Sequence, residues 1–217
     1  MTAKMKPILF NTDMVRAILD DRKTVTRRVV KPQPPGDFPY CQKAHDGSCW
    51  WWNERGGDDD MMRWWPSYDN GLTPPYHPGD ILYVRETWCK TDCFGLQDGY
   101  AYKANDNSIL TETGFVPKWR PSIHMPREAA RIFLRVTDVR VERLQDIDGR
   151  GALSEGVDNR HSNPTMGKRW ENMQRMEFST VWDSTIKPAD RALYGWAANP
   201  WVWVIEFERI SREEASR

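Results

Sequence analysis

The sequence has no excess of charge of either sign and no long apolar run. Its 217 residues carry 31 Lys and Arg against 31 Asp and Glu, so any contact with nucleic acid must come from local clusters of basic residues. No segment approaches the length of a membrane span, and the apolar residues after Lys4 and Lys6 are too few for a signal-peptide core. We therefore expect a cytoplasmic protein with no membrane association.

Cysteine and histidine are also scarce, with four residues of each. Four cysteines in a chain of this length do not make a disulfide framework, and we expect free thiols. CxxxHxxxC at 41–49 and CxxxC at 89–93 offer zinc ligands, although their spacings differ from the short CxxC pairs of ordinary zinc modules. We favour free cysteines, with no metal and no cofactor, and the sequence leaves the oligomeric state open.

Tryptophan, in contrast, is abundant, with 12 residues in all, and five of them fall in one irregular stretch at 50–52 and 64–65. From Pro32 to Gly79 the chain is rich in Pro, Gly and Asp and has no sustained period. Such rings can stack on nucleobases or pack against a domain to anchor a long loop. We favour packing as the commoner role, and different rings can serve each role.

Short strand patterns separated by irregular segments, with few long helices, favour an α+β fold built on a small β-barrel with short helices at its ends. A helix is expected after a cap at Asn11 or Thr12, and it ends near Asp21 or Arg22. β-branched and alternating patterns predict strands at 25–30, 81–86, 130–144 and 199–210. We expect a single domain, 1–217, with loop insertions at about 32–75, 90–115 and 158–195.

Two details of this pattern concern the ends and bends of the elements. The strand at 130–144 changes phase between Val136 and Val139, which indicates a bulge or bend. A short helical turn is expected before Glu155, with Gly156 as its C-terminal cap. The segment 158–198 is polar, with one helical patch around Met173, Met176, Phe178 and Trp182.

A basic cluster lies where the first helix pattern stops and the first strand pattern starts. Five basic residues and no acidic one occur between Arg22 and Lys31, and basic residues beside hydroxyls are typical of phosphate contact. A solvated strand face is the commoner explanation of such a run. Lys23 and Thr26 would lie on opposite faces of a continuous strand, but a break at residue 22 places Lys23 in the turn, where the two can meet.

Lys23, Thr26 and Glu155 are the candidate catalytic residues. A threonine hydroxyl becomes a useful nucleophile when a base takes its proton, and a lysine can do so if burial or neighbouring cations lower its pKa. The cations of Arg22, Arg27 and Arg28 could have this effect. Glu155 ends a helical turn, where the helix dipole disfavours negative charge and so suits the carboxyl to proton transfer; an exposed glutamate before a capping glycine is the commoner case.

The candidate substrate-binding residues are Arg27, Arg28, Glu86, Trp88 and His124. Glu86 and Trp88 lie in "YVRETW", at the end of a predicted strand. For Glu86 an ion pair in the barrel wall is favoured over a catalytic role. His124 is either a structural hydrogen-bonding residue, which we favour, or a residue at the rim of the pocket.

Several segments together resemble the ASCH domain family, in the larger form found in phage and prophage proteins. These are "ILDDRKTVTRR", "PGDILYVRETW", "WRPSIHMPREAARIFLRVTDVRVERLQDI", "SEGV" and "NPWVWVIEF". They cover most of the chain outside 32–75, 90–115 and 158–195. The combination of motifs is specific, although no single motif is.

The resemblance implies a PUA-like β-barrel and recognition of RNA or modified bases. One small bacterial branch of the family hydrolyses the acetyl amide of N4-acetylcytidine with a Lys-x-x-Thr motif and a distant glutamate, which fall here on Lys23, Thr26 and Glu155. The small amidohydrolases lack the long insertions of this chain, so the mouth of the pocket is expected to differ. Some members of the family are described as ribonucleases.

Three functions follow as hypotheses. The first is an amidohydrolase that removes an acyl group from the exocyclic amine of cytidine or a related nucleoside, with Thr26 as nucleophile, Lys23 as base and Glu155 assisting the leaving amine. The second is a non-catalytic module that binds RNA or a modified nucleobase. The third is a metal-dependent ribonuclease that uses Glu86 or the carboxylates at 58–60.

Overall fold

The computed structural model describes residues 5–33, 40–43, 50–53, 64–65, 72–91, 99–105, 114, 116–157 and 167–217. For 40–42, 50–53 and 64–65 only the backbone is described. The strands are β1 Lys6–Leu9, β2 Val25–Val29, β3 Tyr40–Lys43, β4 Trp50–Asn53, β5 Trp64–Trp65, β6 Ile81–Arg85, β7 Trp88–Lys90, β8 Tyr100–Tyr102, β9 Phe133–Arg143 and β10 Trp201–Ile210. The α-helices are α1 Thr12–Leu19, α3 Gly149–Ser154, α4 Lys168–Thr185, α5 Arg191–Tyr194 and α6 Arg212–Ala215, and short 3-10 turns span Ser122–His124, Arg127–Ala129, Leu144–Asp146, Pro188–Asp190 and Trp196–Ala198.

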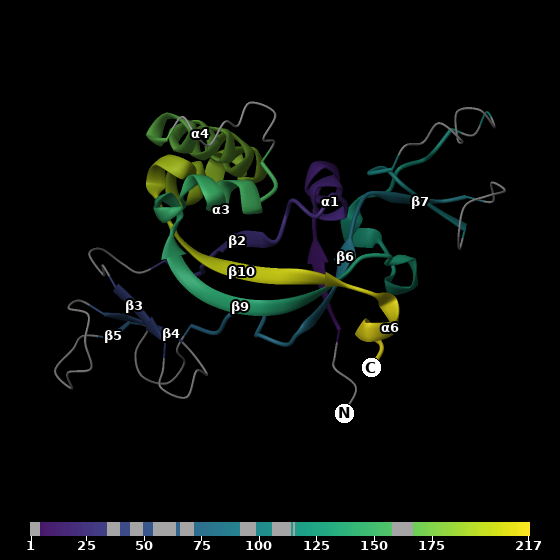
Figure 1. Cartoon of the computed structure of the whole chain (residues 1–217), viewed down its shortest axis with the longest axis horizontal. Helices are drawn as coiled ribbons and strands as arrows, with labels where there is room; N and C mark the ends of the chain where they lie inside the picture. Colours follow the sequence, from purple (N-terminus) through teal and green to yellow (C-terminus); the bar gives the residue numbers. More distant parts are fainter. Residues whose placement is uncertain are drawn as a thin grey trace.

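A five-stranded sheet in the order β1-β6-β9-β10-β2 forms the centre of the molecule. β1 runs parallel to β6, and the other neighbours are antiparallel. β9 and β10 are long and curve together beneath α3 and α4 (Figure 1). Their pairing shifts at one point, because Glu206 faces Asp138 while Phe207 faces Val136. Thr137 is therefore the extra residue of a bulge, which confirms the phase change expected from the sequence.

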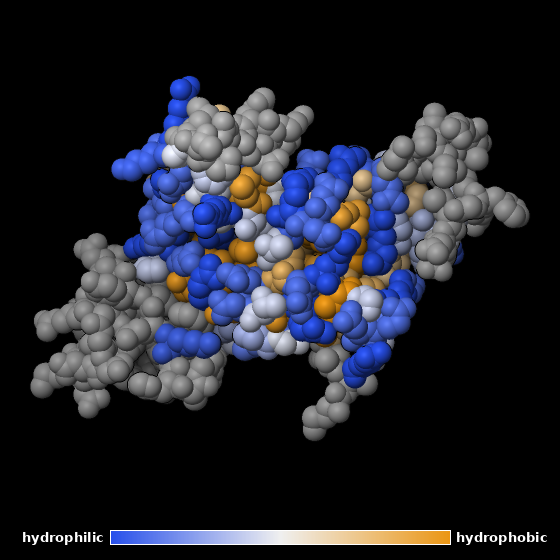
Figure 2. All heavy atoms as spheres, in the orientation of Figure 1, coloured by the Kyte–Doolittle hydropathy of each residue, from blue (hydrophilic) through white to orange (hydrophobic). Residues whose placement is uncertain are grey.

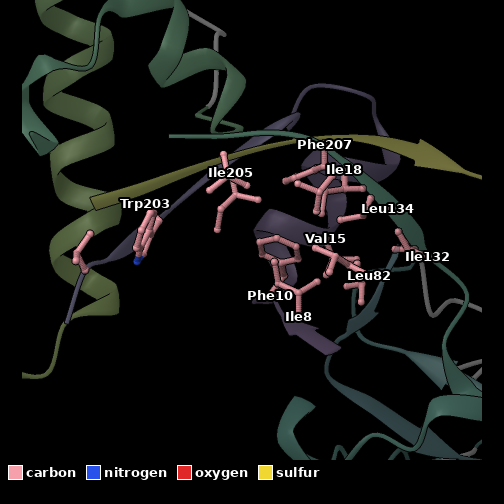
Figure 3. Packing of buried hydrophobic residues seen from close by; sticks show 14 of the residues in the cluster. Ile8, Phe10, Val15, Ile18, Leu82, Ile132, Leu134, Trp203, Ile205 and Phe207 are labelled. Atoms are coloured by element: carbon pink, nitrogen blue, oxygen red, sulfur yellow. The ribbon is translucent and has the colours of Figure 1, made fainter. Parts of the chain in front are cut away.

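The two faces of β10 enter two different clusters of buried residues, as the alternation of its side chains predicts. Trp201, Trp203, Ile205 and Phe207 join the larger cluster with residues of α1, β1, β6 and β9. Several of these side chains point toward one another between α1 and the sheet (Figure 3). Val202 and Val204 face the opposite way, into a cluster that includes Phe178 and Trp182 of α4.

All three expected insertions contain regular structure. The insertion at 90–115 includes β8, which pairs with β7 as a two-stranded antiparallel sheet. The segment expected as an irregular loop at 32–75 includes β3, β4 and β5, which pair as a small antiparallel sheet. The helical patch expected within 158–195 is the 18-residue helix α4. Its buried positions are Gln174, Phe178 and Trp182, one turn apart along a single face, whereas Met176 of the expected patch is 64% exposed.

The architecture is α+β, as expected. Within the described part of the chain the ladder pairs leave β1 and β2 at the two edges of the sheet and form no closed ring, so the expected barrel is not shown by strand pairing. In the same described residues, no helix has both the length and the apolar character needed to cross a bilayer. Hydrophilic residues cover much of the described surface in Figure 2, with hydrophobic ones visible between them.

Replacement of Leu134 by alanine should destabilise the protein through its central sheet. Leu134 lies in β9 and has no solvent exposure, so its loss leaves a cavity and should lower the free energy of unfolding by about 2–5 kcal/mol. Urea denaturation followed by circular dichroism measures this change. Leu193→Ala is the matched control, because Leu193 is 64% exposed and its truncation should change stability by less than about 0.5 kcal/mol. Equal effects of the two substitutions would contradict the described core.

Candidate active site

The turn between α1 and β2 places Lys23 outside both elements, as the proposed break at residue 22 predicts. Asn11 caps the helix by accepting a hydrogen bond from the backbone N–H of Met14. The helix ends at Leu19, and Asp21 adopts a left-handed conformation with φ 55°. The backbone N–H groups of Arg22 and Lys23 then both donate to the carbonyl oxygen of Ala17, and this tight turn directs Lys23 toward the end of α3.

Glu155 reaches Lys23 from the C-terminal end of α3. The two residues form an isolated backbone bridge, and the N–H of Thr24 donates to Ser154 O at 2.9 Å. Gly156 follows with φ +90°, which confirms the expected cap. A Cβ on Gly156 would lie 2.7 Å from Cβ of Ala17 and 3.1 Å from Cβ of Lys23, so glycine permits the close approach of α3 to the turn.

The amine of Lys23 is fully enclosed and fully hydrogen-bonded. Its side chain has 0% exposure. Nζ donates to Glu155 Oε2 at 2.6 Å, to Val25 O at 2.7 Å and to Glu155 O at 2.9 Å. These three acceptors match the three N–H groups of an ammonium. The ring of Phe10 lies 5.6 Å from Nζ and helps to exclude water from this side.

Burial lowers the pKa of Lys23, and the carboxylate of Glu155 opposes this effect. The guanidinium groups of Arg28 and Arg27 add smaller contributions that also lower the pKa. Two of the three arginines expected to act in this way therefore do so. With Oε2 of Glu155 only 2.6 Å from Nζ, a proton can pass from the amine to the carboxylate and leave a neutral amine beside a carboxylic acid.

Thr26 lies in β2 next to this amine. Val25 O, which accepts a hydrogen bond from Lys23 Nζ, belongs to the peptide group that joins Val25 to Thr26, so the amine is held against the backbone of Thr26. Thr26 is 3% exposed and lines a cavity of about 140 Å³. Among the described residues its hydroxyl has no hydrogen-bond partner, which leaves it available to a substrate.

The cavity at Thr26 lies between β2 and the helices α1 and α4. Arg27, Arg28 and Glu155 contribute polar groups to its lining, and α1 and α4 contribute apolar side chains: Met14, Phe178, Val181 and Trp182. A larger cavity of about 490 Å³ adjoins it, and both are lined by Asn11, Met14, Glu155 and Val181. The two together offer a polar corner at Thr26 and Glu155 with an apolar wall beside it.

Both arginines after Thr26 line this cavity. Arg27 Nη1 donates to Glu155 Oε1 at 3.3 Å, and Nη2 donates to Glu142 Oε2 at 3.2 Å. Its Nε is buried and has no hydrogen-bond partner among the residues that the structure describes. Arg28 Nη2 donates to Leu9 O at 2.8 Å, and its guanidinium carbon lies 5.5 Å from the centroid of the Phe10 ring.

The other three expected site residues are not among the described residues that line these two cavities. Glu86 is 1% exposed and forms a two-pronged contact with Arg131 at 2.8 and 3.0 Å, which matches the ion-pair interpretation. Burial raises the pKa of Glu86, and Arg131 opposes that change. Trp88 packs edge-on against Tyr100. His124 lies exposed in a 3-10 turn.

Two contributions to the site were not anticipated from the sequence. The helical spacing of Phe178 and Trp182 was visible, but nothing in it indicated that α4 covers β2. Glu142 belongs to a strand with alternating cations and anions, "RVER", and its contact with Arg27 depends on the order of β9, β10 and β2 in the sheet.

The metal hypotheses fall largely outside the described residues. Cys49, Cys93, His45 and the carboxylates at 58–60 are not described, and Cys41 is described only through its backbone. Cys89 is buried. Within the part of the chain that the structure describes, no group of three or more His, Cys, Asp or Glu side chains is arranged to hold a metal ion.

Comparisons of this chain with models of protein families, with curated proteins and with solved structures found no match. The structure itself brings Lys23 of the Lys-x-x-Thr motif into contact with the distant Glu155.

Substitution of Gly156 by alanine tests how closely α3 must approach Lys23. The positive φ is strained for alanine, and the added Cβ would contact Ala17 at 2.7 Å, so the free energy of unfolding should fall by about 1–3 kcal/mol. Urea denaturation measures this loss. Gly167→Ala is the control, because Gly167 also has a positive φ but nothing lies within 4 Å of its added Cβ. If both variants lost the same free energy of unfolding, backbone strain alone would explain the effect of Gly156→Ala.

The stability of the protein should depend on pH through Lys23. Since the pKa of Lys23 is lowered in the folded state, the unfolded chain binds more protons between that lowered value and about 10.4. Stability conferred by this group therefore rises with pH in that window, by at most about 1.4 kcal/mol per pH unit.

Comparison with Lys23→Met isolates this contribution. The unfolding free energy of the wild type should increase relative to that of the variant between pH 7 and 10, as measured by urea denaturation. Lys90→Met serves as control for the loss of a lysine at an exposed position. A constant difference for Lys23→Met would show that Lys23 titrates as in the unfolded chain.

Proposed function

We propose that the protein is a hydrolase that removes an acyl group from the exocyclic amine of a modified pyrimidine nucleoside, with N4-acetylcytidine as the substrate to test first. The observation that carries this proposal is that Thr26 and Glu155 line one cavity, while the buried amine of Lys23 contacts Glu155 at 2.6 Å. Among the described residues the hydroxyl of Thr26 has no hydrogen-bond partner. The resemblance of the motifs to the ASCH family supplies the substrate class. Such a substrate fits a cytoplasmic enzyme.

The proposal includes a PUA-like barrel as the scaffold. The strong curvature of β9 and β10 (Figure 1) supports it. So does a contact between the two edges of the sheet, because Arg28 of β2 donates to Leu9 O at the end of β1. Phe10, directly after β1, lies under both Arg28 and Lys23. The two edge strands are thus connected through side chains at the level of the site.

In the first chemical step, Thr26 Oγ1 attacks the carbonyl carbon of the acetyl amide. Lys23, neutral after passing a proton to Glu155, accepts the hydroxyl proton. The protonated Glu155 then donates its proton to the exocyclic nitrogen as the C–N bond breaks. Cytidine leaves, an acetyl ester remains on Thr26, and the pair returns to an ammonium and a carboxylate.

In the second step, water attacks the ester on Thr26. Glu155, now a carboxylate, accepts a proton from the water, and the ammonium of Lys23 returns a proton to Thr26 Oγ1 as the ester bond breaks. Acetic acid leaves and ionises in solution. The neutral amine and the carboxylic acid are restored, so one water is consumed for each amide hydrolysed.

The remaining groups of the cavity suit recognition of the base and its acyl group. Phe178 and Trp182 offer an apolar wall for an aromatic ring. Arg28 has no carboxylate partner among the described residues, so its guanidinium can donate to a carbonyl oxygen. Arg27 keeps Glu155 oriented through Nη1.

Substitutions at Thr26 test the proposed nucleophile. Thr26→Val keeps the shape of the side chain and removes the hydroxyl, so release of cytidine from N4-acetylcytidine should fall by at least about a hundredfold. Thr26→Ser keeps a hydroxyl and should retain activity within about tenfold, although its added rotational freedom lowers the rate. Chromatography with mass spectrometry measures cytidine, and circular dichroism checks the fold.

The same assay distinguishes the rival functions. Equal turnover by the wild type and by Thr26→Val would show that Thr26 is not the nucleophile. Salt-dependent binding of RNA by the wild type, with no product from any modified nucleoside, would instead identify a binding module. RNA cleavage that chelator abolishes would identify a metal-dependent ribonuclease.

A further inference from the structure

A chain of alternating charges runs from Lys23 to the surface of the sheet. Lys23 contacts Glu155 at 2.6 Å, Glu155 contacts Arg27 at 3.3 Å, and Arg27 contacts Glu142 at 3.2 Å. Glu142 in turn contacts Arg140 at 2.5 Å. Side-chain exposure rises along this path from 0% at Lys23 to 26% at Glu142 and 36% at Arg140. The buried amine is therefore connected to solvent through an ordered series of ion pairs.

The strand register builds this series on one face of the sheet. Val204 of β10 lies opposite Arg27 of β2 on one side and opposite Arg140 of β9 on the other. Directly paired residues in antiparallel strands project from the same face, so Arg27 and Arg140 share the face on which Val204 packs. Glu142 is two residues from Arg140 and projects from this face as well. This arrangement places Glu142 within reach of both arginines.

We propose that Glu142 is a positioning residue of the active site, which holds Arg27 against Glu155 and balances its positive charge. This inference rests on the proposed function of Lys23 and Glu155. Arg27 has two roles that conflict. Its Nη1 orients the carboxylate of Glu155, but its positive charge also stabilises that carboxylate and disfavours the neighbouring ammonium. The carboxylate of Glu142 beside Nη2 holds Arg27 in place to orient Glu155. Its negative charge also offsets the positive charge of Arg27 that disfavours the ammonium of Lys23.

The charges around Lys23 come from few elements. Glu155 faces it from the end of α3, and Arg27 and Arg28 face it from β2. Arg22 of the turn donates to Gly156 O and pairs with Asp20. From α1, Asp13 and Arg16 line the larger cavity and pair with each other. On its outer side Glu142 faces Arg140, which also contacts Asp138 and Glu206.

Glu142→Gln separates the effect of Glu142 on the position of Arg27 from the effect of its negative charge. The amide oxygen of glutamine can still accept from Arg27 Nη2, so Arg27 should stay in place while its charge loses a counter-ion. The uncompensated arginine then disfavours the ammonium of Lys23, and the pKa of Lys23 should fall by about half a unit or more. The loss of a merely structural ion pair would leave this pKa unchanged.

The experiment is a pH titration of the lysine Cε signals in protein labelled with ¹³C-lysine. The Lys23 signal is identified by its absence from Lys23→Met. Its midpoint should move to lower pH in Glu142→Gln. Glu208→Gln is the control, because Glu208 forms an ion pair with Arg135 between β10 and β9 and lies outside the series. Its midpoint should equal that of the wild type.

A midpoint that is the same in Glu142→Gln and in the wild type would overturn the inference. A Lys23 signal that does not titrate in either protein would overturn it as well. The pH profile of N4-acetylcytidine hydrolysis gives a second readout, because the mechanism requires the proton that Lys23 and Glu155 share, and activity falls as the pH rises through the pKa of Lys23 and this proton is lost. This fall should move to lower pH in Glu142→Gln. Absence of hydrolysis by the wild type, together with a shifted Lys23 midpoint, would overturn only the proposed function.

Discussion

The contact between Lys23 Nζ and Glu155 Oε2, 2.6 Å long and closed off from water, is the interaction on which the site depends. It joins two segments that are 132 residues apart, the start of β2 and the end of α3. Burial of either charge alone would be strongly unfavourable, so the two segments must dock together for either side chain to be accommodated. The local structure on both sides serves this docking, with Asp21 in a left-handed turn and Gly156 at positive φ.

The central sheet also supports the contact between Lys23 and Glu155. β10 separates two clusters of buried residues with its alternating side chains, and the face that carries Val202 and Val204 also carries the arginines and carboxylates that reach Glu155. The apolar residues of this face exclude water, which strengthens the ion pairs beside them. Hydrophobic packing and the polar series therefore depend on one another, because the same strand register fixes both.

Local features of the site could be predicted from the sequence, and long-range ones could not. The cap at Asn11, the break before Lys23 and the turn at Gly156 each depend on a few neighbouring residues, and each was found. Which expected side chains share the cavity depends on sheet order instead. Glu86 and His124 lie in polar segments as Glu155 does, yet Glu86 contacts Arg131 and His124 faces solvent. The contact of Glu142 with Arg27 could not be expected without knowing that β9 and β2 both flank β10.

Stability alone does not account for this arrangement. Replacement of a buried ion pair by apolar side chains of similar volume is often neutral or stabilising in proteins, and the interior around Lys23 already contains Phe10 and Ala17, against which a methionine could pack. Burial removes the hydration of the Lys23 ammonium. The three hydrogen bonds of Nζ must offset this cost each time the chain folds. The proposed function gives this cost a chemical explanation, because the neighbouring hydroxyl of Thr26 has no partner among the described residues. In the proposed mechanism, the amine that shares its proton with a carboxyl group takes a proton from that hydroxyl and returns it, which an apolar side chain could not do.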